Sequence, residues 1–99
     1  MRKMKIEDFK LSLKNSTPPK SLNPLLLALW YDAKNDWQKA HQTAQDIENK
    51  DGSWIHGYLH RKEGDLSNAS YWYSRAGREM SSEPHEKEWE TILIELISK

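Results

Sequence analysis

The stretch GDLSNA at residues 64–69 decides how this 99-residue chain is interpreted, because a similar stretch, NDWQKA, occupies residues 35–40. Each stretch offers a turn residue, an aspartate, an apolar residue and, three positions further on, an alanine. Aspartate is a preferred helix N-cap, and a small side chain one turn later lets a second helix approach closely. The two stretches, 29 residues apart, therefore predict two helical hairpins in series.

The residues around these hairpins also favour helices. Valine is absent, and leucine, alanine, lysine and glutamate are frequent, a composition typical of helices and poor for sheets. We therefore expect one all-α domain over residues 1–99, a compact bundle of five to six helices. Apolar spacing and a stretch rich in proline and serine divide it into an N-terminal helix in 1–15, a linker at 16–23, hairpins over 24–50 and 51–77, and a C-terminal helix over 83–98.

Glycines mark the limits of the second hairpin. Asp51 is followed by Gly52, a pair that favours turns, so the next helix is expected to start at Ser53. Gly64 ends that helix, and Gly77 stands where the following helix needs a left-handed C-terminal cap. The second hairpin is therefore expected between two glycine-containing turns.

Small and aromatic residues recur as Gly57, Gly64-Asp65, Ala69, Tyr73 and Ala76 in the second hairpin and as Ala28, Tyr31, Asn35-Asp36 and Ala40 in the first. With this spacing the second hairpin resembles a tetratricopeptide repeat, in which small residues let antiparallel helices approach and a large ring fills the remaining gap. The first hairpin matches less fully, because Ala44 replaces the usual aromatic residue and the 29-residue separation is shorter than the family's 34. The resemblance implies a protein-interaction module.

A second resemblance covers about half of the chain. It is carried by residues 28–77, which include Asp36-Trp37, Leu59-His60-Arg61, Glu63-Gly64-Asp65 and Tyr71-Trp72-Tyr73. These residues look like a family of small bacterial proteins of unassigned function. The likeness implies the helical fold and a bacterial source, and it supplies no activity.

One face of the helix expected at 53–63 carries aromatic and basic side chains. Trp54 and Tyr58 are four residues apart, and Arg61 and Lys62 follow one turn later. In tetratricopeptide repeats this face lines the concave groove that holds peptides. These four residues are therefore the predicted binding site for an unidentified protein or peptide partner. The alternative is that the N-terminal segment or the C-terminal helix fills the groove, because two hairpins alone bury little surface.

Further rings and charges lie on the second hairpin. Tyr71, Trp72 and Tyr73 point in three directions on a helix, so at least one ring must be exposed or interfacial. Arg75 and Arg78 add positive charge that a phosphate or carboxylate ligand could bridge. Pairing with nearby acidic residues is the simpler explanation of these charges.

Three of the four histidines form a candidate site. His56 and His60 share a helix face, and His41 lies on the preceding helix. Zinc or iron accepts such nitrogen ligands, but the metalloprotease motif HExxH is incomplete. We expect these rings to pack and to form hydrogen bonds, with no metal and no cofactor. The alternative is a small ligand-binding protein or enzyme with a His-rich interhelical pocket walled by Trp54 and Tyr58.

Composition argues against several functional classes. Positive and negative side chains balance at 15 each, which disfavours nucleic acid as a partner, and the absence of cysteine excludes disulfides and thiolate sites. The longest apolar run, residues 25–31, is far shorter than the roughly 20 residues of a membrane helix. No nucleophile elbow, phosphate loop or dinucleotide fingerprint is present, so an enzyme is not favoured. We expect a cytoplasmic protein without an export signal, and a homo-oligomer is compatible with the sequence.

Overall fold

The computed structural model describes residues 4–99, and the part of the predicted N-terminal helix at 1–3 lies outside them. The described residues form six helices and no strand, which confirms the all-α expectation. The bundle has a radius of gyration of 12.7 Å. Its helices are α1 (Ile6–Ser12), α2 (Pro24–Ala33), α3 (Trp37–Gln45), α4 (Lys50–Glu63), α5 (Leu66–Ala76) and α6 (His85–Ile97).

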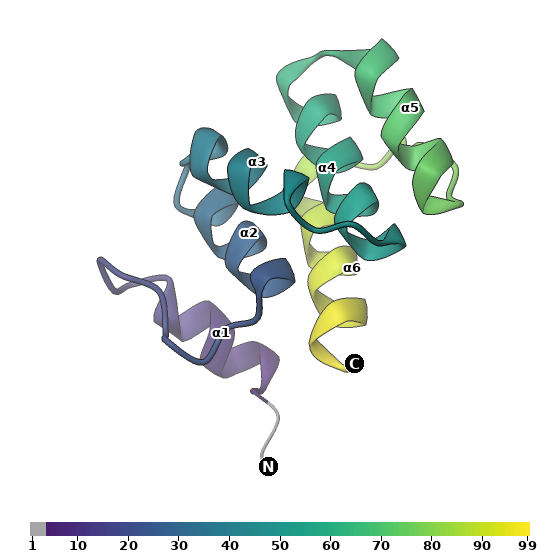
Figure 1. The fold of residues 1–99 in the computed structure, drawn as a ribbon. Coiled ribbons are helices and arrows are strands. Elements are labelled where there is room, and N and C mark those ends of the chain that lie inside the picture. The colour runs from purple at the N-terminus through teal and green to yellow at the C-terminus, as the bar shows by residue number, and fades with distance from the viewer. Residues whose placement is uncertain (1–3) are drawn as a thin grey trace.

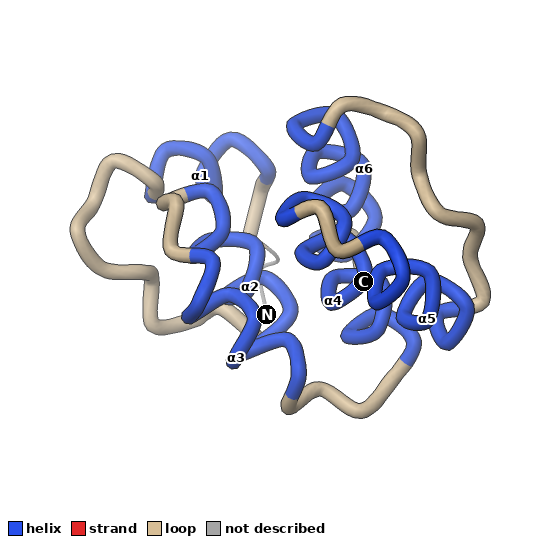
Figure 2. The backbone as a smooth tube through the Cα atoms, turned by 90° about the horizontal axis from the view of Figure 1, so that it is seen from above, coloured by secondary structure: helices blue, strands red, loops and turns tan. Residues whose placement is uncertain are grey.

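The helices pair as two hairpins, α2 with α3 and α4 with α5, and α4 lies between α3 and α5 (Figure 1). Helix α6 packs against α2 and α4, so it joins the two hairpins from one side. Helix α1 lies on the α2 side of the molecule, away from α5, as the view from above also shows (Figure 2). Among the described residues, no helix combines the length and the apolar character that a bilayer crossing requires.

The two repeated stretches adopt the same turn. Asn35 and Gly64 both have left-handed backbone conformations, with φ of 63° and 92°. The next residue in each case, Asp36 or Asp65, accepts a hydrogen bond from the backbone N–H three positions on and caps the following helix. The sequence repetition thus corresponds to a repeated turn geometry that folds each helix pair back on itself.

The start of α4 differs from the prediction. The helix begins at Lys50 and not at Ser53, and the Asn49 side chain caps it by accepting from the Gly52 N–H at 2.8 Å. Gly52 is therefore helical, and the turn predicted at Asp51 and Gly52 is wrong. A Cβ at Gly52 would lie 2.3 Å from the Ile47 carbonyl oxygen, so this glycine is required by close packing.

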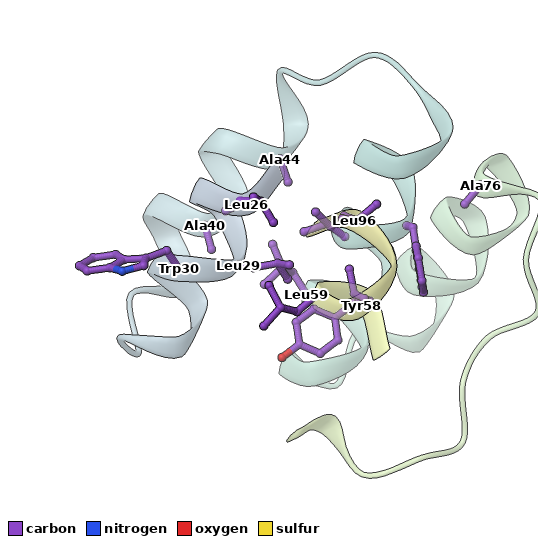
Figure 3. Packing of buried hydrophobic residues seen from close by; sticks show 14 of the residues in the cluster. Leu26, Leu29, Trp30, Ala40, Ala44, Tyr58, Leu59, Ala76 and Leu96 are labelled. Carbon is purple, nitrogen blue, oxygen red and sulfur yellow. The ribbon is translucent and has the colours of Figure 1, made fainter. Parts of the chain in front are cut away.

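A hydrophobic core runs between the hairpins and α6 (Figure 3). Leu29, Leu59 and Tyr58 point toward one another there, and Leu96 from α6 lies against them. Trp30 points away from this group, and its Nε1–H donates to the Ser12 hydroxyl of α1 at 3.1 Å. The core therefore joins α6 to both hairpins, and α1 is attached through Trp30 and through Phe9, whose buried ring contacts Trp89 of α6.

Candidate functional site

Helix α4 carries the predicted site residues on two opposite faces. Tyr58 and Arg61 face α2 and α6, where their partners lie, and Trp54 lies on the same face under Arg78 of the connection between α5 and α6. His56 and His60 face α3 and α5, where they meet His41 and other rings. The structure therefore separates the predicted groove residues from the predicted histidine site.

The groove face is closed on the side of α2. Tyr58 is only 1% exposed, and its hydroxyl donates to Asp32 Oδ2 at 2.6 Å. Lys62 donates to the other oxygen of the same carboxylate at 2.9 Å. Burial, together with the neighbouring Asp32 charge, raises the pKa of Tyr58 above its ordinary value. Tyr58 is thus a neutral, buried hydrogen-bond donor that joins α4 to α2.

Helix α6 closes the other side of the groove face. Arg61 donates to Glu88 Oε1 from Nε at 3.1 Å and from Nη2 at 2.9 Å, and the Tyr73 hydroxyl donates to the second carboxylate oxygen. Trp54 is 4% exposed, and the Arg78 guanidinium covers its ring at 3.4 Å from the centroid. The expectation of an open groove is therefore wrong: α2, the C-terminal helix and Arg78 from the α5–α6 connection cover it, because burying these rings gains more than leaving them in water.

The three histidines come together on the opposite face. His41 Nε2 lies 2.9 Å from His56 Nε2, and one ring nitrogen from each of His41, His56 and His60 falls within 4.8 Å of the others. His56 and His60 are 5% and 6% exposed, whereas His41 is half-buried at the rim. The cluster is thus a compact set of nitrogen donors with one edge toward solvent.

Neighbouring side chains hold the rings in place. Glu63 Oε1 lies 2.8 Å from His60 Nδ1, and because a carboxylate accepts, this nitrogen carries a proton; in the neutral ring Nε2 then holds the lone pair. Trp37 stacks on His41 with ring centroids 4.8 Å apart, and Trp72 stacks on His56 at 3.9 Å. The walls of the cluster are therefore Trp37 and Trp72.

Trp54 and Tyr58 do not wall the histidine cluster, contrary to the alternative hypothesis drawn from the sequence. Residues 54 and 58 are separated from 56 and 60 by about half a helical turn, which places the two pairs on opposite faces. That spacing is visible in the sequence and could have excluded them. Trp37 and Trp72 lie on other helices, and no spacing along α4 points to them.

Burial favours the uncharged form of His41 and His56. It lowers the pKa of His56 to about 4, and the neighbouring His41 and His60 add to this effect. Burial also lowers the pKa of His41, with a further contribution from His60. Neutral imidazoles can accept hydrogen bonds or ligate metal ions through a lone pair.

An aromatic and cationic flank on α5 borders the cluster. Tyr71 is 53% exposed and Tyr73 is buried, so the expectation that at least one of the three adjacent rings is exposed is confirmed. The Arg75 guanidinium lies 5.4 Å from the Trp72 ring and 5.8 Å from the Tyr71 ring, and it donates to the Tyr71 hydroxyl at 3.0 Å. We call Tyr71, Trp72 and Arg75 the α5 flank.

Two surface hollows are relevant to these residues. One, of about 600 Å³, is lined by the connection between α3 and α4 and by Trp72 and Arg75. A larger one, of about 780 Å³, lies between α1, the start of α2 and the end of α6, and holds none of the predicted site residues. The smaller hollow adjoins the α5 flank through Trp72 and Arg75, and Trp72 also stacks on His56.

Comparisons with protein families, curated proteins and solved structures found no match for this chain.

Proposed function

We propose that this chain is a non-catalytic protein-interaction module with tetratricopeptide-like hairpins, and that its partner binds at the α5 flank. The observation that carries the proposal is the ordered cluster of Tyr71, Trp72 and Arg75 beside the hollow of about 600 Å³. Tyrosine, tryptophan and arginine dominate binding energy at protein interfaces. Because Arg75 already holds both rings, little side-chain entropy is lost when a partner docks.

Charge indicates the kind of partner. Arg61, Lys62 and Arg78 are paired with carboxylates that are remote in the sequence, and not with the nearby acidic residues that we expected. Within residues 4–99, by contrast, no carboxylate forms an ion pair with Arg75 or with Lys50, which lines the same hollow. We therefore propose an acidic segment of a partner protein, with an apolar side chain that packs on the exposed rings.

The cellular setting belongs to the proposal as well. A bacterial cytoplasm fits the resemblance carried by residues 28–77 and the absence of cysteine. The balanced net charge supports a protein partner over nucleic acid. A second copy of this chain is a partner that the test below must also detect.

The test is co-purification with a matched pair of variants. The tagged chain, Tyr71→Ala with Arg75→Glu, and Ile94→Ala are used as baits, and bound proteins are quantified by mass spectrometry. Ile94 is a suitable control because it is 50% exposed on α6, away from the flank. We expect a protein that binds the wild type and the Ile94→Ala bait alike and is retained at least about tenfold less by the double variant.

Two results would count against the proposal. One is a partner that survives the double change while circular dichroism shows an unaltered fold. The other is the absence of any protein retained in a manner that depends on the flank. Sedimentation of the pure chain distinguishes self-association, since a dimer that the double variant abolishes makes a second copy the partner.

A second candidate function has one observation in its favour. The sequence left open a small-ligand site or enzyme centred on the histidines, and three ring nitrogens from two helices do converge. The walls of the histidine cluster are Trp37 and Trp72 and not the expected Trp54 and Tyr58. Trp72 belongs both to these walls and to the α5 flank. What these nitrogens bind is a separate question, which does not depend on the partner protein.

A further inference from the structure

Three imidazoles, one from α3 and two from α4, share one small volume between these helices. We propose that His41, His56 and His60 bind a single transition-metal ion, with Zn²⁺ as the ion that fits this donor set best. The inference goes beyond the proposed partner binding and stands without it. It also reverses the expectation, drawn from the sequence, that these rings only pack and form hydrogen bonds.

The distances suit a small ion. Zinc binds imidazole nitrogen at about 2.0–2.1 Å, so two ligands of a tetrahedral site lie about 3.3 Å apart. The observed separation of the His41 and His56 Nε2 atoms is 2.9 Å, and the three donor atoms lie within 4.8 Å of one another. In a tetrahedral site the His41–His56 separation would therefore be slightly longer than the observed one, and any pair of donors near 4.8 Å would have to approach.

Glu63 supplies the second feature of a metal site. A ligating histidine usually donates its other ring N–H to a carboxylate, which fixes the tautomer and the ring orientation. The contact of 2.8 Å between His60 Nδ1 and Glu63 Oε1 has this form, and it leaves the His60 Nε2 lone pair for the ion. Glu63 is thus a positioning residue for the proposed ligand.

The chemistry of the donors selects the metal. Calcium and magnesium need oxygen ligands, whereas imidazole suits zinc, copper and nickel. Three histidines leave one tetrahedral position for water or an external ligand, and the half-buried His41 places the edge of the cluster at the solvent. Trp37 and Trp72 restrict ring motion on both sides, because each stacks on one histidine.

The contacts within the cluster also have an explanation that involves no metal ion. His41 and His56 share a hydrogen bond, and His60 pairs with Glu63, so each ring has a partner. For metal binding, the ring that donates from Nε2 must also move its proton to Nδ1, which frees both Nε2 lone pairs. A purely structural cluster of hydrogen bonds is therefore the competing explanation, and the experiment must separate the two.

The experiment uses the full chain, treated with a chelator and dialysed. Zn²⁺ is titrated by calorimetry, and bound metal is counted by mass spectrometry. We expect one ion per chain. His56→Gln and His60→Gln should each weaken binding at least tenfold, because glutamine keeps much of the volume and hydrogen bonding but is a poor zinc ligand. His85→Ala is the matched control, since His85 lies at the start of α6 outside the cluster.

Two further measurements keep the test decisive if a histidine variant unfolds. Bound Co²⁺ should give the intense visible absorption of a tetrahedral site in the wild type. Glu63→Gln keeps all three proposed ligands and should weaken Zn²⁺ binding about 10–100-fold. The proposal is overturned if the wild type binds no stoichiometric Zn²⁺, or if His85→Ala weakens binding as much as the cluster variants do. A metal bound equally well by His56→Gln overturns it too.

Discussion

Replacing Arg61 by glutamate tests whether α6 truly closes the predicted groove. Arg61 makes two hydrogen bonds to Glu88, and its Nη2 also donates to the Glu83 carbonyl oxygen at 2.7 Å. Only 3% of the Glu88 side chain is exposed. Arg61→Glu therefore removes the cationic partner of a buried carboxylate and places a second negative charge beside it.

The expected magnitude follows from this burial. Removing one partner of a buried ion pair costs about 3–5 kcal/mol. Tyr73 still donates to Glu88, which offsets part of the loss, but repulsion between the two carboxylates adds to it. We expect at least about 3 kcal/mol, against a typical total stability of about 5–15 kcal/mol. For a domain of this size that corresponds to a decrease in Tm of roughly 12–24 °C.

Urea unfolding followed by far-ultraviolet circular dichroism measures the effect. Arg75→Glu is the matched control, because it makes the same chemical change on the exposed side of α5 and should alter stability by no more than about 0.5 kcal/mol. If Arg61→Glu unfolds at the same urea concentration as the wild type, the reasoning is refuted. Arg61 would then be a free surface residue, and the groove would again be a candidate for peptide binding.

Three other changes probe the cluster and the helix packing. The pKa of His56 is about 4 in the folded protein against 6.5 in the unfolded chain. Its contribution to stability is therefore complete above pH 6.5 and is lost as the pH falls toward 4. Unfolding measured at several pH values should show a loss on the order of 3 kcal/mol over this range, and His56→Gln should remove that loss. Trp54→Ala should cost about 3–5 kcal/mol in thermal unfolding, and an unchanged melt would contradict its burial. Ala69 is fully buried, so Ala69→Leu should overpack the α4–α5 contact and lower the free energy of unfolding, measured by denaturant titration, by about 1–3 kcal/mol. An unchanged free energy of unfolding would show that the two helices can separate.

The helices and turns were predictable because their signals are local. A left-handed residue followed by an aspartate cap acts within one turn of helix, so Asn35-Asp36 and Gly64-Asp65 could be identified without the rest of the chain. The start of α4 was missed for the opposite reason. Gly52 is required by its close contact with Ile47. The sequence alone does not distinguish a glycine required by packing from a glycine required by a turn.

The candidate site was predictable only in part. His56, His60 and Glu63 share a face of α4 by spacing alone, and the pairing of His60 with Glu63 follows from that spacing. The separation of Trp54 and Tyr58 from the histidines also follows from helix geometry. The stacking of Trp72 on His56 depends on how α5 lies against α4, which spacing along one helix does not determine.

By itself the sequence determined an all-α chain with two similar hairpins, because helix propensity, capping and turn formation act between residues close in the chain. Only the tertiary structure decided which faces of α4 are covered. Glu88 meets Arg61 across 27 positions, and that contact depends on how much apolar surface α6 buries in total. The same holds for His41 and His56, whose ring nitrogens come within 2.9 Å because α3 packs on α4.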